Sequence, residues 1–266
     1  MRLFRFLAPL AVLAASPALA AEGQALPADP LNSPMWEYHA AKLFSDAPVT
    51  FDDRVKVILP VIAENQHVVP VTVDARALAG VKRIVILADL NPIPVAIDYR
   101  PMHAAPFVAT RIKLDQRTPV RAAVQLADGS WHVAGEWIDA AGGGCSAPPV
   151  SRARGDWADH LGEMRGAAWT DGSGTRLRFG FRHPMDTGLV ENIPAYNIET
   201  VRVTGSDGTP LAEVTVHGSV SEDPSFTLEL DDSGGPVAIS ARDTNGLEFD
   251  GRVDPASGRR LAAAGQ

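Results

Sequence analysis

The sequence contains 266 residues with a formal net charge of −8, and 45% of the residues are hydrophobic. An acidic chain repels the phosphate backbone of nucleic acids, so we expect no nucleic-acid partner. The length suits one large domain or two ordinary ones, and 23 glycines and 21 prolines favour short strands and turns over long helices.

The first twenty residues predict a secretory signal peptide. Arg2 and Arg5 form a positive head, residues 3–13 are almost wholly apolar, and Ala18-Leu19-Ala20 is a small-x-small cleavage site. The apolar run is shorter than the roughly 20 residues of a membrane-spanning helix. We therefore expect a periplasmic protein that has no membrane attachment once residues 1–20 are removed. A buried N-terminal helix is the alternative reading of this segment.

One short helix is predicted next, with Ser33 as its cap and Pro34 at its first position. Apolar residues then recur at helical spacing, namely Trp36, His39, Ala40, Leu43 and Phe44. We expect this helix to lie against the first domain.

From Val55 onwards the pattern changes to strands. Short β-branched runs occupy residues 55–59, 68–73, 83–87 and 94–97, residues 110–114 alternate strictly, and residues 120–126 place their apolar side chains on one face. Asp128-Gly129 is a turn signal that leads into a strand over residues 131–137, which predicts a hairpin. Short strands and turns at this spacing indicate a β-sandwich.

A second strand-rich region begins near Thr175, where Leu177, Phe179 and Phe181 alternate with polar residues. Further runs follow at residues 201–203, 212–216, 226–230, 237–239 and 247–249. The predicted domains are therefore a signal peptide (1–20), a first β-sandwich (30–140), a glycine arm with a connector (141–166) and a second β-sandwich (167–256).

Catalytic and cofactor motifs are absent from the sequence. There is no Gly-x-Ser-x-Gly, no His-x-x-x-His pair and no phosphate-binding glycine pattern between a strand and a helix. His183 precedes a proline and is interpreted as a structural or interface residue rather than as a metal ligand. We expect no catalytic site, no metal and no cofactor.

Cys145 is the single cysteine, which is unusual for an exported protein because such proteins pair their cysteines. Gly142, Gly143 and Gly144 precede it, and Ser146-Ala147-Pro148-Pro149 follows. This composition favours an exposed thiol on a flexible arm over the two alternatives, a buried hydrophobe or an accidental thiol. A tethered thiol suits delivery rather than catalysis, and we expect at most a mild shift of its pKa.

Two sets of motifs resemble a known pair of families. In the first region they are Val68-Val69-Pro70-Val71, Asn91-Pro92, Thr110-Arg111-Ile112-Lys113-Leu114 and Gly143-Gly144-Cys145. In the second they are the run from Arg182 to Leu189, Ile193-Pro194-Ala195-Tyr196 and Asp223-Pro224-Ser225-Phe226. The first region resembles SoxY and the second resembles SoxZ, the two halves of the periplasmic sulfur carrier of thiosulfate oxidation. More narrowly, the chain resembles the fused SoxYZ-like carriers associated with quinoprotein dehydrogenases.

The resemblance implies an all-β fold of two immunoglobulin-like β-sandwich domains in tandem, with one short N-terminal helix. It implies that Cys145 is the covalent attachment site of a sulfur intermediate, and that Gly142, Gly143 and Gly144 form its arm. The partners implied are periplasmic redox or sulfur-processing enzymes, including a quinoprotein (PQQ-dependent) dehydrogenase system. The sequence departs from the family where Ser146-Ala147 replaces Gly-Gly and where the chain continues beyond the arm.

The leading hypothesis is thus a non-enzymatic carrier. One alternative is a binding or assembly module for a periplasmic quinoprotein dehydrogenase, in which Cys145 is dispensable. A thiol enzyme is a third reading, and it requires a thiol pKa well below about 8.5.

Overall fold

The computed structural model describes residues 26–153, 155–171, 174–231 and 235–254. The predicted signal peptide, residues 1–20, lies outside the described residues. In the described part, no helix has the length and apolar character needed to cross a membrane.

The first half of the molecule, residues 26–140, contains one helix and nine strands. They are α1 (Trp36–Phe44), β1 (Val49–Phe51), β2 (Lys56–Ile58), β3 (Ile62–Ala63), β4 (Val69–Asp74), β5 (Val81–Ala88), β6 (Val95–Arg100), β7 (Ala104–Ile112), β8 (Thr118–Leu126) and β9 (Trp131–Ala140). Along β4 and β7 buried and less buried residues largely alternate, which is the signature of a strand with one face on a core.

The second half, residues 164–254, consists of strands and is reached through a short connector. The connector holds α2 (Val150–Ala153) and a turn of 3₁₀-helix (Trp157–His160). The strands are β10 (Met164–Asp171), β11 (Gly174–Phe181), β12 (Ile198–Thr204), β13 (Pro210–Val216), β14 (Ser225–Leu230), β15 (Val237–Asp243) and β16 (Glu248–Val253).

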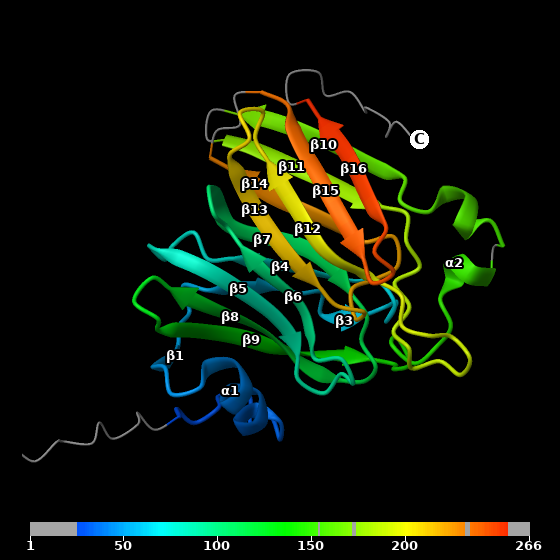
Figure 1. Ribbon diagram of the computed structural model, residues 1–266. Coiled ribbons are helices and arrows are strands. Elements are labelled where there is room, and N and C mark those ends of the chain that lie inside the picture. Colours follow the sequence, from blue (N-terminus) through cyan, green and yellow to red (C-terminus); the bar gives the residue numbers. More distant parts are fainter. Residues whose placement is uncertain (1–25, 154, 172–173, 232–234, 255–266) are drawn as a thin grey trace, which may run out of the picture.

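The two halves are joined edge to edge into one large sandwich (Figure 1). Sheet A runs β1-β9-β8-β5-β6-β13-β12-β15-β16, with β3 also paired to β9, and sheet B runs β10-β11-β14-β7-β4-β2. The joint, here called the seam, consists of the antiparallel pairs β6–β13 and β7–β14. Each half therefore completes a strand edge that would otherwise expose unpaired backbone groups.

A single hydrophobic core fills the space between the sheets and crosses the seam. It includes Val71 and Val108 from the first half and Phe179 and Leu228 from the second, and all four are almost completely buried. Val108 and Leu228 are also direct cross-strand partners. The two predicted sandwiches are thus continuous rather than merely docked on each other.

Helix α1 covers the outer face of sheet A in the first half. Trp36 and Phe44 pack there with Trp131 of β9, and the ring centroids of Phe44 and Trp131 are 5.1 Å apart. The helix begins at Trp36 with Met35 as its N-cap, two residues later than the cap predicted at Ser33. The reason is a preceding turn, in which the Asp29 carboxylate accepts hydrogen bonds from the backbone N–H groups of Leu31 and Ser33.

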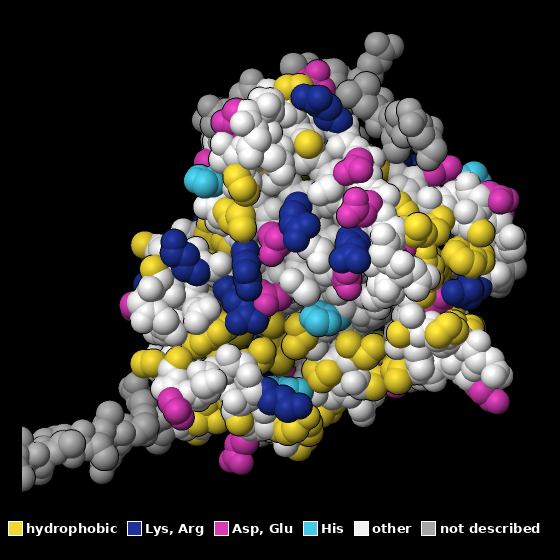
Figure 2. Space-filling view, in the orientation of Figure 1, with side chains coloured by type: hydrophobic (Ala, Val, Ile, Leu, Met, Phe, Trp, Pro, Cys, Tyr) yellow, Lys and Arg dark blue, Asp and Glu magenta, His cyan; other side chains and the backbone are white. Residues whose placement is uncertain are grey.

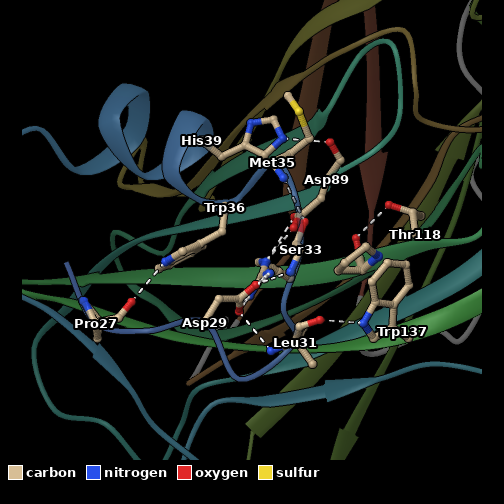
Figure 3. A network of polar contacts seen from close by, with 12 residues as sticks. Pro27, Asp29, Leu31, Ser33, Met35, Trp36, His39, Asp89, Thr118 and Trp137 are labelled. Atoms are coloured by element: carbon tan, nitrogen blue, oxygen red, sulfur yellow. Dashed lines mark hydrogen bonds and ion pairs between the residues drawn. The ribbon is translucent and has the colours of Figure 1, made fainter.

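A buried ionic cluster ties this N-terminal segment to the sheet (Figure 3). Arg121, 1% exposed, donates hydrogen bonds to both Asp29 and Asp89 at 2.7–3.0 Å. Burial raises the pKa of Asp29, but the hydrogen bonds from Arg121 and the turn outweigh it and lower that pKa overall. His39 of α1 completes the cluster with a 2.8 Å contact to the carbonyl of Asp89.

The predicted all-β fold class with one short N-terminal helix is confirmed. Two of the boundary differences bear on the site: β7 ends at Ile112 rather than at Leu114, and β10 begins at Met164, inside the segment predicted as connector. Lys113 leaves the strand because its backbone N–H donates a hydrogen bond to the backbone carbonyl of Ser219 across the seam.

We expect Arg121→Met to destabilise the whole chain by about 3–5 kcal/mol, since it leaves two buried carboxylates without their cation. Arg54→Met is the matched control: Arg54 pairs with Asp52 but its side chain is 58% exposed, so the unfolding midpoint should stay close to that of the wild type. Urea unfolding should be followed by far-ultraviolet circular dichroism and by tryptophan fluorescence.

Because the core crosses the seam, both signals of Arg121→Met should shift together in one transition. The fluorescence transition could instead move to lower urea while part of the circular dichroism signal still unfolds at the wild-type urea concentration. That result would contradict a core shared by the two halves.

Candidate functional site

Cys145 lies at the seam and is buried. Its exposed fraction is 1%, and its Sγ lies 3.9 Å from the backbone carbonyl oxygen of Lys113. The prediction of an exposed thiol on a free arm is therefore wrong for this conformation. The arm, residues 141–149, is folded back onto the chain that follows β7.

Backbone hydrogen bonds hold the arm in this closed position. The N–H of Gly143 donates to the carbonyl of Asp115 at 3.2 Å, and the N–H of Gly144 donates to the carbonyl of Leu114 at 3.0 Å. Within the arm, the N–H of Ala147 donates to the carbonyl of Gly143 at 3.0 Å. Residues with no apolar periodicity thus obtain order by pairing with a distant segment.

The carboxylate of Asp115 is the main polar anchor of the arm. Its Oδ1 accepts hydrogen bonds from the backbone N–H of Cys145 (3.1 Å) and from both the N–H (3.1 Å) and the hydroxyl (3.0 Å) of Ser146. Hydrogen bonds to an ionised acceptor are stronger than neutral ones. Asp115 is itself fixed, because its N–H donates to the side-chain oxygen of Asn91 at 2.9 Å.

The glycines serve close packing in this conformation. A Cβ on Gly144 would lie 2.4 Å from the carbonyl oxygen of Gln66 and 2.5 Å from that of Leu114, distances that side chains do not tolerate. Gly142 and Gly143 have φ values of +99° and +83°, which favour glycine. The sequence prediction assigned these three residues to a flexible, thin arm and missed their role in seating it.

The second half clamps the arm and connector from the other side of the seam. The Thr187 hydroxyl donates to the carbonyl of Cys145 at 2.7 Å. The two carboxylate oxygens of Glu222 accept the N–H groups of Val150 and Ser151, each at 2.7 Å. Arg152 forms an ion pair with the buried Asp186. The connector is therefore docked on the molecule rather than exposed along its length.

A buried lysine lies beside the thiol. Lys113 is 3% exposed, and its ammonium group donates to the backbone carbonyls of Met185 and Gly218. Burial lowers the pKa of Lys113 to about 8. Burial also raises the pKa of Cys145 to about 12, although the positive charge of Lys113 acts in the opposite direction. The predicted mild shift of the thiol pKa is therefore wrong, and the closed thiol is protonated near neutral pH.

The closed site has very little free volume beside the arm. A cavity of about 10 Å³ lies beside the arm and is lined in part by Lys113, Gly144, Thr187 and Glu222. That volume is at the lower limit for one water molecule. Any group added to the Cys145 thiol would therefore require the arm to leave this position.

The other singled-out residue, His183, is a core residue. It is 2% exposed and its ring lies 4.5 Å from that of Tyr196. Burial lowers the pKa of His183 to about 4. Among the described residues, no group of three or more His, Cys, Asp or Glu side chains is placed to bind a metal ion.

Sequence reasoning missed four residues that hold the site: Lys113, Asp115, Thr187 and Glu222. Lys113 and Thr187 lie inside motifs that carried the family resemblance, at 110–114 and 182–189, and this was the only available signal. Asp115 and Glu222 act through contacts between segments far apart in the chain, which no local pattern reveals.

Comparisons with known proteins agree with this division of the chain. Residues 40–145 match the family model of the sulfur oxidation protein SoxY, and residues 164–254 match that of the sulphur oxidation protein SoxZ. Among solved structures, the sulfur carrier protein SoxY from Chlorobium limicola f thiosulfatophilum is similar at 24% identity and a TM-score of 0.36, over 40% of this chain and 91% of that chain. A search of curated proteins finds no match.

We predict that Asp115→Ala accelerates the reaction of Cys145 with a small thiol reagent by roughly 10–100-fold, because it removes three charge-assisted hydrogen bonds that close the arm. The measurement is the rate of reaction with a chromogenic disulfide at pH 8 in native buffer. Asp128→Ala is the matched control, since Asp128 holds the N–H and hydroxyl of Ser130 in the same way in the β8–β9 turn.

Asp128→Ala should leave the reaction rate unchanged. The wild type and Asp115→Ala could instead react at equal rates, both as fast as the urea-unfolded protein. That result would mean that the arm is open in solution.

Proposed function

We propose that this chain, in which residues 40–145 match SoxY and residues 164–254 match SoxZ, is a fused SoxYZ-like protein and a periplasmic carrier of covalently bound sulfur. Cys145 holds the sulfur intermediate and presents it to partner enzymes. The observation that carries the proposal is the position of the single thiol, which ends the SoxY match and lies on a segment held by side chains of both halves.

The seam explains why two families are combined in one chain. The arm leaves β9 of the SoxY half and is anchored by Asp115 from that half and Thr187 from the SoxZ half, while Glu222 from the SoxZ half anchors the connector that follows it. A SoxY half alone would lose the last two contacts and the strand partners of β6 and β7. The SoxZ half thus acts as a structural support for the carrier site.

Loading requires the arm to open, because the closed thiol is buried and protonated. Ala140 is the last residue of β9, and the five residues from there to Cys145 extend at most about 17 Å. The arm is tied at both ends, so the exposed thiol travels a short distance beside the seam. This geometry suits a partner that docks against the molecule and receives the thiol in a shallow active site.

The chemistry assigned to Cys145 is sulfur transfer from a sulfane-sulfur donor. The thiolate attacks the outer sulfur of the donor, and a new S–S bond forms as the bond between that sulfur and its leaving group breaks. The leaving group departs with the bonding electron pair, the thiol proton goes to solvent, and a persulfide remains on Cys145. No external oxidant is needed for this step, and the thiolate is the reactive form.

A second candidate function is an assembly module for a periplasmic quinoprotein (PQQ-dependent) dehydrogenase, with a dispensable cysteine. The observation that favours it is the 1% exposure of Cys145, since a buried free cysteine also occurs as an inert core residue. The partner class is supported by the family resemblance of the sequence.

Substitution of the thiol separates the two functions. We expect wild-type protein isolated from its native periplasm to begin at Ala21 and to include a population heavier by one or more sulfur atoms, as measured by intact mass. Cys145→Ser should show the unmodified mass only and should abolish sulfur-dependent pathway activity, with unchanged expression. Ser146→Ala, the neighbouring control, should retain both the adduct and the activity.

Full activity of Cys145→Ser in the native host would refute the carrier proposal and support the assembly module.

A further inference from the structure

The outer face of sheet B carries a groove lined by arginines. Four of them, Arg111 of β7, Arg165 of β10, Arg178 of β11 and Arg182, line a depression of about 540 Å³ together with Trp169. We call these five residues the arginine groove. Small residues form part of its lining, including Ala167, Gly180 and Ser225.

The groove contains fewer acidic side chains than basic ones. Its two acidic residues are already engaged, because Asp223 pairs with Arg182 at 2.8 Å and Glu163 contacts His160 at 2.6 Å. Arg165 and Arg178 are exposed, and neither forms a hydrogen bond or ion pair with another described residue, although the charge of Arg165 helps to lower the pKa of Glu163. Excess positive charge on one face of an acidic protein indicates an anionic ligand.

The guanidinium group of Arg111 also lacks part of its hydrogen bonding within the groove. One of its terminal nitrogens donates to the backbone carbonyl of Asp223 at 3.2 Å, while its Nε is buried and has no partner among the described residues. Burial, followed by repulsion from the nearby Arg178, lowers the pKa of Arg111. An anion placed between these two guanidinium groups would relieve the repulsion.

The shape of the face favours a protein segment over a single small ion. Trp169 is 53% exposed, and a second depression of about 520 Å³ lies against Trp169, Arg176, Arg178 and Thr227. Two adjoining hollows that share Trp169 and Arg178 extend over more surface than one oxyanion contacts. Tryptophan and arginine are also the residue types that contribute most binding energy at protein interfaces.

A different face of the molecule lacks this concentration of charge. Figure 2 shows basic and acidic side chains interleaved on the face that it presents. Sheet A has such matched pairs, for example Arg202 with Glu213 at 3.0 Å and Arg83 with Asp98 at 2.6 Å. Sheet A therefore offers basic residues of the same type as controls.

The groove lies close to the carrier site. Arg111 is two residues before Lys113, whose carbonyl oxygen contacts the Cys145 thiol. Asp223 of the groove directly follows Glu222, which holds the connector through the N–H groups of Val150 and Ser151. A protein bound in the groove would therefore rest beside the segment that must open.

We propose that the arginine groove docks an acidic segment of the partner protein that exchanges cargo with Cys145. This inference rests on the proposed carrier function for the identity of the partner, and on the groove itself for the acidic chemistry. Docking through long-range charge speeds association and orients the partner toward the arm.

The test uses a fluorescein-labelled peptide of ten glutamates as the probe and fluorescence anisotropy as the readout, with the full mature chain at low salt. Arg165→Glu/Arg178→Glu should weaken binding by at least tenfold, and Trp169→Ala should weaken it several-fold. Arg202 of β12 and Arg252 of β16 are exposed residues of sheet A, and Arg202→Glu/Arg252→Glu makes the same change in net charge there. This control should weaken binding less than twofold. All substituted side chains are exposed, and circular dichroism should show an unchanged fold.

Cys145→Ser should bind the peptide as tightly as the wild type does. A failure of the carrier proposal and a failure of the docking proposal can therefore be told apart. No binding to the wild type, or an equal loss in the sheet A control, would overturn the proposal. Binding of free thiosulfate in the groove without binding of the peptide would also overturn it, in favour of a small-anion site.

Discussion

Edge-to-edge pairing of β6 with β13 and of β7 with β14 is the constraint on which the rest of the molecule depends. It converts two small sandwiches into one, with a single core, and it fixes the chain after β7 against the loop before β14. Lys113 and Asp115 lie on one side of this joint, and Thr187 and Glu222 lie on the other. The closed position of the arm is therefore a consequence of how the halves pair.

Burial of the thiol gives the carrier a protected state. A reactive cysteine in an oxidising compartment forms mixed disulfides, and a thiol with its pKa raised to about 12 reacts slowly because the thiolate is scarce. Lys113 is a buried cation whose charge acts on the thiol, and it is held by backbone carbonyls rather than by a carboxylate. Its charge would lower the electrostatic cost of an anionic sulfur near the seam, while the small cavity beside the arm would not hold the proposed adduct.

Most strands could be predicted from the sequence because alternation along a strand is a local property, as at residues 120–126 of β8. The arm could not, because its order comes from contacts with Gln66, Leu114 and Thr187, which are distant in sequence. A glycine run signals freedom of the backbone, but the same lack of side chains permits the closest packing of backbone on backbone. The seam was also missed, because the residues of an edge strand do not indicate which strand it will pair with.

The central claim is that the arm opens locally while the seam stays closed, and amide hydrogen exchange measured by mass spectrometry tests it most directly. The account predicts that peptides covering Gly143–Ser146 exchange at least a hundredfold faster than peptides covering β6 and β13, and that Asp115→Ala accelerates only the arm. Opening of such segments has a lower free energy than global unfolding. Exchange of the arm at the same rate as the seam strands, through global unfolding alone, would contradict it.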